Sequence, residues 1–190
     1  MPYGTDKFTP YAVDVIFTRL SFAVWPVDDY TKKEPVGRIS VMIKQGDGKA
    51  VKNLSGYYTF TNLPDGIYTV VIESDWYFSE EKAVDISLLD SRKPVVEIEL
   101  KPKPSYPFPD HATLVRGLIL NAEQAVNAEV TVPGKAIKTI VDARGEFVLY
   151  FKGNEPESIT IEIKKGADVK TVSTTIEEGK TISLVIIDFP

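Results

Sequence analysis

The side chains that could support acid–base or metal chemistry are few in this chain of 190 residues. It holds one histidine, His111, and no cysteine, so two-histidine and thiolate metal sites are excluded. A histidine that acts as a general base needs a nucleophile and an orienting acid. Its neighbour Asp110 points away from it in an extended backbone, and no serine stands in a G-x-S-x-G turn. This pattern predicts a chain that is not an enzyme and has no cofactor.

The carboxylates include adjacent pairs in predicted loops: Asp28-Asp29, Glu80-Glu81 and Glu177-Glu178. Glycoside hydrolysis needs two carboxyls about 5–10 Å apart across a cleft, one of them shielded from water. Nothing in these loops indicates a cleft, so solvated turn charges are the preferred interpretation and a hydrolase with an unusual carboxylate pair is the alternative. Turn carboxylates also suit calcium, which makes Asp28, Asp29 and Asp47 calcium candidates. No full coordination pattern is present, and no metal site is predicted.

Aromatic side chains that could bind a ligand concentrate in the first half of the chain. Trp76, Tyr77 and Phe78 are consecutive, so they cannot all face one side of a strand. An exposed Trp-Tyr pair beside carboxylates could stack on a sugar ring or anchor a protein partner. The alternative is that Trp76 or Phe78 closes the end of a core while Tyr77 lies at the surface. Trp25 and Tyr30 form a second candidate.

The elements that must position these residues are strands. Apolar residues alternate with polar ones, with Ile39, Val41 and Ile43 as the first example. The same pattern recurs over residues 67–72, 96–100, 159–163 and 182–187, and no long amphipathic helix is visible. Turn residues such as Asp65-Gly66 separate the runs. Short strands at this spacing predict an all-β fold of two tandem antiparallel Greek-key β-sandwiches.

A proline-rich stretch separates the two halves. Residues 102–109 contain four prolines, which cannot donate to a sheet ladder and favour an extended polyproline II spacer. A proline-rich ligand for an aromatic groove is one alternative. Another, which we prefer to a free tether, is that Tyr106 and Phe108 pack on a domain and fix the angle between the halves. We expect domains at 1–101 and 112–190, joined by a linker at 102–111.

Charge and hydropathy exclude several partners. The chain has 22 basic and 27 acidic residues and a formal charge of −5, and neither half has the positive surplus that nucleic-acid binding requires. No apolar run approaches the roughly 20 residues of a membrane span. The start of the sequence shows no signal peptide. The compartment stays open: synthesis in the cytoplasm with assembly into a particle and secretion are both compatible with the sequence.

The two halves contain similar motifs. The first reads G-x-Y-x-F-x-N-L-P-x-G-x-Y-x-V over residues 56–70, and the second places Gly117, Ala128, Val130, Gly145 and Phe147 in order. The pattern resembles the transthyretin-like, or carboxypeptidase regulatory-like, family and the related Cna B-type repeats. Val141 departs from the threonine of that pattern. The resemblance implies an Ig-like sandwich in each half and does not specify a function.

Two activities known among such folds are not expected here. The 5-hydroxyisourate hydrolases resemble this fold but carry several active-site histidines and a C-terminal Y-R-G-S, which this chain lacks. The isopeptide crosslink of Cna B-type repeats needs a lysine on the first strand. Glu73 and Asp188 match the acidic positions, but the opening strands carry Arg19 and Arg116 instead of lysine.

The combined pattern predicts a non-catalytic structural or protein-interaction module. Such a module would serve as a spacer or adaptor in a surface, secreted or phage-tail-like assembly, with a protein as its partner. The alternative is a carbohydrate-binding module that uses exposed aromatics of the first domain. Nucleic acid and membrane insertion are not expected.

Overall fold

The computed structural model describes residues 17–46, 48, 50–152, 156–187 and 189, and within them the protein is all-β. The N-terminal strands are β1 (Leu20–Asp28), β2 (Ile39–Ile43), β3 (Val51–Lys52), β4 (Tyr58–Thr61), β5 (Ile67–Ser74), β6 (Glu80–Asp85) and β7 (Val95–Leu100). The C-terminal strands are β8 (Thr113–Ile119), β9 (Glu129–Thr131), β10 (Lys138–Ile140), β11 (Glu146–Phe151), β12 (Glu157–Lys165), β13 (Asp168–Ile176) and β14 (Thr181–Ile187). Two short helices, η1 (Ile86–Leu88) and α1 (Ala122–Ala125), lie in connections. Neither described helix has the length and apolar character that crossing a membrane requires.

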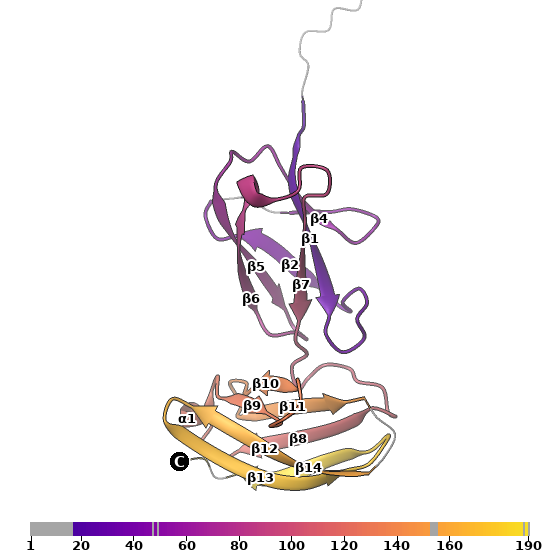
Figure 1. The fold of residues 1–190 in the computed structure, drawn as a ribbon, viewed down its shortest axis with the longest axis vertical. Helices are drawn as coiled ribbons and strands as arrows, with labels where there is room; N and C mark the ends of the chain where they lie inside the picture. Colours follow the sequence, from indigo (N-terminus) through magenta and orange to yellow (C-terminus); the bar gives the residue numbers. More distant parts are fainter. Residues whose placement is uncertain (1–16, 47, 49, 153–155, 188, 190) are drawn as a thin grey trace, which may run out of the picture.

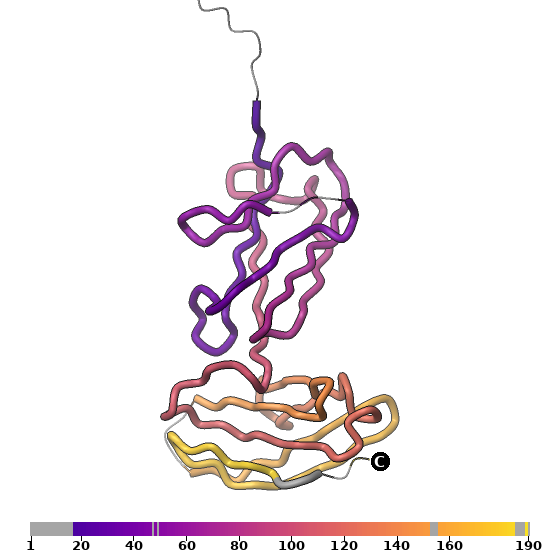
Figure 2. The backbone as a smooth tube through the Cα atoms, turned by 180° about the vertical axis from the view of Figure 1, so that it is seen from behind, coloured from indigo at the N-terminus to yellow at the C-terminus, as the bar shows by residue number. Residues whose placement is uncertain are grey.

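The strands form four sheets, two in each half of the chain. The N-terminal sheet pair (residues 20–100) has the strand orders β3-β4-β1-β7 and β2-β5-β6. The C-terminal sheet pair (residues 113–187) has the orders β11-β8-β14 and β10-β9-β12-β13. Figure 1 shows the two sheet pairs stacked end to end, and Figure 2 shows the single chain segment that joins them.

The two sheet pairs share a topology. In each, the first strand pairs with the last and with a hairpin strand, β7 and β4 for β1, and β14 and β11 for β8. This repetition agrees with the internal similarity in the sequence. The prediction of antiparallel sheets is wrong at two places, because β1 pairs with β7, and β8 with β14, in parallel. Alternation reports which face of a strand is buried and contains no information about strand direction.

Each sheet pair encloses its own hydrophobic core. Val41, Ile43, Val70 and Ile72 lie in the N-terminal cluster together with Tyr77, and the isoleucines of β12 lie in the C-terminal cluster. Val41 and Ile43 are positions that the alternating pattern assigned to the interior, and Ile39 beside them is half-buried. A third, smaller cluster of Ala112, Leu114 and Val148 lies between the sheet pairs, because β8 and β11 also turn apolar side chains away from the C-terminal core.

Candidate interaction site at the junction of the sheet pairs

A buried carboxylate holds the connecting segment against the N-terminal sheet pair. Asp28, the last residue of β1, is completely buried. Its Oδ2 accepts hydrogen bonds from the phenols of Tyr77 at 3.0 Å and Tyr106 at 2.5 Å. Its Oδ1 accepts from the backbone N–H groups of Tyr30 at 2.8 Å and Thr31 at 3.3 Å. A buried carboxylate is costly unless it is hydrogen-bonded, and these four donors satisfy Asp28.

The two phenols stay protonated over a wide pH range. Burial, with the nearby Asp28 carboxylate, raises the pKa of Tyr77 to about 12. Burial and the hydrogen bond to Asp28 raise the pKa of Tyr106 as well. Both hydroxyls therefore keep donating to Asp28 at neutral pH.

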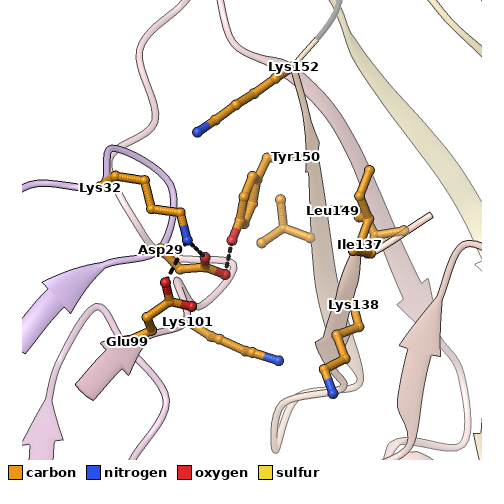
Figure 3. A pocket seen from close by; sticks show the side chains of 11 residues that line it. Asp29, Lys32, Glu99, Lys101, Ile137, Lys138, Leu149, Tyr150 and Lys152 are labelled. Carbon is orange, nitrogen blue, oxygen red and sulfur yellow. Dashed lines mark hydrogen bonds and ion pairs between the residues drawn. The ribbon is translucent and has the colours of Figure 1, made fainter. Parts of the chain in front are cut away.

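A second carboxylate joins the two sheet pairs directly (Figure 3). Tyr150 of β11 donates its phenol hydrogen to Asp29. Lys32 reaches Asp29 at 2.5 Å and Glu99 at 2.9 Å. Burial of Asp29 favours a higher pKa, but the hydrogen bonds from Lys32 and Tyr150 outweigh it and lower the pKa of this carboxyl. The Asp29 carboxylate thus accepts hydrogen bonds from Lys32 of the N-terminal half and from Tyr150 of the C-terminal half.

Aromatic rings fill the space between the sheet pairs. Tyr30 packs edge-on against Tyr106, Phe108 and Tyr150, with ring centroids 6.1, 5.1 and 5.3 Å away. Tyr106 and Phe108 lie 4.6 Å apart. The rings of Tyr30, Phe108 and Tyr150 also cover the small cluster of Ala112, Leu114 and Val148. Edge-to-face contacts of this kind add directional packing to the burial of apolar area.

The proline-rich segment contacts both sheet pairs. On the N-terminal side, the N–H of Phe78 donates to the carbonyl of Lys101, and the N–H of Lys103 donates to the carbonyl of Trp76, at 2.9 and 2.8 Å. On the C-terminal side, Arg116 of β8 donates to the carbonyl of Pro104 at 2.6 Å, and its guanidinium lies 5.7 Å from the centre of the Phe108 ring. Tyr106 is buried and Phe108 is half-buried, whereas Ser105 and Pro107, before and between them, are exposed. The two aromatic side chains therefore pack on neighbouring elements, as one interpretation of this stretch expected.

A cleft of about 390 Å³ opens beside the Tyr150–Asp29 contact (Figure 3). The charged residues that line it come from both sheet pairs and their adjoining loops: Asp29, Lys32, Glu99, Lys101, Lys138 and Lys152. Its apolar wall includes Ile137, Val148 and the ring of Tyr150.

The structure does not place Trp76 and Tyr77 as an exposed aromatic pair. Tyr77 is fully buried and Phe78 is 9% exposed, so neither presents a ring to a surface ligand. The expectation that Tyr77 lies at the surface is wrong, because its hydroxyl is held by Asp28 and by the N–H of Val36 at 3.0 Å. Trp76 is half-buried over the backbone of Gly37.

The second aromatic candidate is split between two places. Tyr30 belongs to the junction, whereas Trp25 is half-buried and packs on Tyr57, with ring centroids 4.6 Å apart. The two therefore do not form one site.

Of the three calcium candidates, Asp28 and Asp29 are engaged in other contacts. The oxygens of Asp28 and Asp29 accept the hydrogen bonds described above, and Asp47 lies outside the described residues. No group of three or more histidine, cysteine or acidic residues suited to a metal ion occurs within the described part of the chain. His111 is exposed.

Sequence reasoning missed Tyr150 and the lysines of the cleft. A usable signal was present, because Phe147, Leu149 and Phe151 of β11 face the C-terminal core. The residues between them, Val148 and Tyr150, are also apolar or aromatic. A strand that is apolar on both faces is covered on both. That pattern indicates a second contact surface on β11.

Comparisons with known proteins leave the family open. No family model matches the chain, and no curated protein sequence matches it. Among solved structures, the chain is similar to the Bacillus anthracis TIE protein, with a TM-score of 0.32 and 18% identity over 88% of this chain. The chain spans 33% of the length of that protein.

Two pilins are similar at the same level. GBS52, the minor pilin of the Gram-positive pathogen Streptococcus agalactiae, has a TM-score of 0.29 and 13% identity, covering 88% of this chain and 95% of the pilin. A double mutant of the shaft pilin SpaA from Lactobacillus rhamnosus GG has a TM-score of 0.29 and 10% identity, covering 89% and 97%. Likeness at this level carries no argument about function.

Proposed function

We propose that this chain is a non-catalytic spacer and protein-interaction module made of two tandem β-sandwich domains held at a fixed angle. The observation that carries the proposal is the junction: Tyr150 bonds to Asp29 while four aromatic rings fill the space between the sheet pairs. A freely moving tether would leave these rings in water. A packed connecting segment instead fixes the orientation of one domain relative to the other, as a spacer requires.

The domain boundaries of the proposal are those expected from the sequence: 1–101, a linker at 102–111, and 112–190. Two observations support them. The two large hydrophobic clusters share no residue, and the strand pairings of β1 recur in β8. Each domain would thus have a core of its own.

The absence of catalysis is supported by how the polar groups at the junction are used. The carboxylates of Asp28 and Asp29 hold phenols and an ammonium group in place. A general acid or base must lie within hydrogen-bond reach of the substrate proton that it transfers. The single histidine lies exposed outside the cleft.

The fixed angle is tested by residual dipolar couplings of the aligned full chain. We expect one alignment tensor to fit both sheet pairs of the natural protein. Replacing the rings in Tyr30→Ala/Tyr150→Ala removes the contact across the junction, so two different tensors should then be needed. Tyr57→Ala, which removes a ring from the outer side of the N-terminal sheet pair, is the control and should leave one tensor. Two tensors in the natural protein would contradict the proposal.

A second candidate function is carbohydrate binding. The paired rings of Trp25 and Tyr57 favour it, and they would take the stacking role that the sequence suggested for Trp76 and Tyr77. Both rings are half-buried and lie beside the Lys52–Glu34 ion pair. The chain has two tryptophans, so a Trp76→Phe variant reports fluorescence from Trp25 alone. A response to a glycan panel in this variant supports the candidate, and silence across the panel eliminates it.

A further inference from the structure

The junction cleft carries a charge opposite to that of the whole chain. Four lysines and two acidic residues line it, whereas the chain has a net charge of −5. Both acids are already engaged, because the ammonium group of Lys32 binds Asp29 and Glu99. Within the described residues, no carboxylate lies within ion-pair distance of the other three: Lys101, Lys138 and Lys152.

The three lysines surround an apolar wall. Lys138 and Lys152 are exposed, and Lys101 is half-buried. In Figure 3, Lys101 and Lys138 extend from opposite sides of the cleft and Lys152 lies toward its other end. Ile137, Val148 and the ring of Tyr150 lie among them. A ligand that fits must therefore combine several negative charges with aliphatic groups.

We propose that the junction cleft binds an acidic peptide segment of a partner protein. Two or more carboxylates of that segment pair with Lys101, Lys138 and Lys152, and an aliphatic side chain packs on Ile137 and the ring of Tyr150. The cleft volume of about 390 Å³ lies within the roughly 300–1,000 Å³ of ligand pockets, which suits a few side chains of a longer segment. The inference rests on the proposed function and names the surface and the partner chemistry of the interaction module.

Charge distribution favours a peptide over a uniform polyanion. A sulfated glycan or a nucleic acid carries charge along its whole length and binds best to a protein with a large positive surplus, whereas this chain has a net charge of −5. An acidic peptide segment places a few carboxylates locally and offers apolar side chains between them. Complementary charge also orients such a partner as it approaches.

The test uses the full chain and a fluorescein-labelled octapeptide of alternating glutamate and leucine, followed by anisotropy. We expect saturable binding that weakens as salt is added, because salt screens exposed charges. The variant Lys138→Ala/Lys152→Ala should raise the Kd about tenfold, the effect of losing two exposed ion pairs. A peptide with glutamine in place of glutamate should not bind.

A matched control keeps the result specific to the cleft. Lys93→Ala/Lys164→Ala removes two exposed lysines that do not line it and should leave the Kd unchanged. Equal Kd values for the two double variants, equal binding of the glutamine peptide, no binding of either peptide, or tighter binding of a heparin fragment would each overturn the inference. If any of these results is obtained while a single alignment tensor still fits both sheet pairs, the acidic-peptide site is rejected and the rigid spacer is still supported.

Discussion

Asp28 is the residue on which the N-terminal side of the junction most depends. It is completely buried and accepts hydrogen bonds from Tyr77 and Tyr106, which lie 49 and 78 positions away in the chain. Removing one partner from a buried charged group is costly, because the group left behind has lost its water as well. The phenol of Tyr106 is the partner that ties the proline-rich segment to β1.

Tyr106→Phe removes one hydroxyl and leaves the ring in place. Because its hydrogen bond goes to a charged acceptor, we expect a loss of about 1.5–3 kcal/mol in the free energy of unfolding, measured by urea denaturation. Tyr68→Phe is the matched control, since the Tyr68 hydroxyl donates to the carbonyl of Pro64 at an exposed site. It should change stability by no more than about 0.5 kcal/mol. Equal effects of the two variants would show that Asp28 does not depend on Tyr106.

At the scale of elements, the pairing of β8 with β11 explains two of the sequence motifs. Gly117 lies directly opposite Phe147 in the register of these strands. A Cβ at Gly117 would lie 2.2 Å from the Phe147 ring, and a Cβ at Gly145 would lie 2.5 Å from the carbonyl oxygen of Ile119. Gly117 and Phe147 of the sequence pattern thus form one contact, in which a fully buried ring covers a glycine.

Gly117→Ala should destabilise the protein by about 1–3 kcal/mol, because Phe147 is packed on all sides and cannot move away without strain. Phe147→Leu removes the ring edge that the new methyl group meets. The double variant should therefore lose less stability than the sum of the two single changes, with a coupling of about 0.5–3 kcal/mol in a denaturation cycle. Strictly additive losses would mean that the ring and the glycine do not constrain each other.

Individual strands could be predicted because alternation is a local property. The buried positions of β2, β5, β7 and β12 follow from the residues of each strand alone. The parallel pairing of β1 with β7 could not be predicted in this way, since it depends on how the chain crosses between sheets.

At the scale of the whole molecule, the junction gathers tyrosines whose ionisation would break it. The pKa of Tyr77 is raised from 10.0 to about 12, and those of Tyr106 and Tyr150 are raised by burial and by hydrogen bonds to Asp28 and Asp29. A group whose pKa is raised by folding adds stability that is complete below its unfolded pKa. That stability is lost as the pH rises through the folded value, here between about 10 and about 12 for Tyr77.

An alkaline titration followed by phenolate absorbance measures this directly. Of the nine tyrosines, we expect at least these three to remain protonated in the native chain at about pH 11, where an unfolded chain in urea has ionised most of its phenols. Small-angle X-ray scattering over the same pH range should show an increase in the radius of gyration only when the phenols with raised pKa values ionise. Titration of all nine near the ordinary value in the native chain would contradict the buried junction.

The sequence by itself determined the all-β class and the positions of the strands that alternate most clearly. These features depend on side-chain period and backbone restriction, which act within a few residues. Only the tertiary structure decided that Tyr77 is buried, that Asp28 and Asp29 hold tyrosines instead of open turn sites, and that lysines from both sheet pairs face one cleft. The physical reason is that hydrogen bonds and fields act through space, between groups whose separation along the chain gives no sign of their contact.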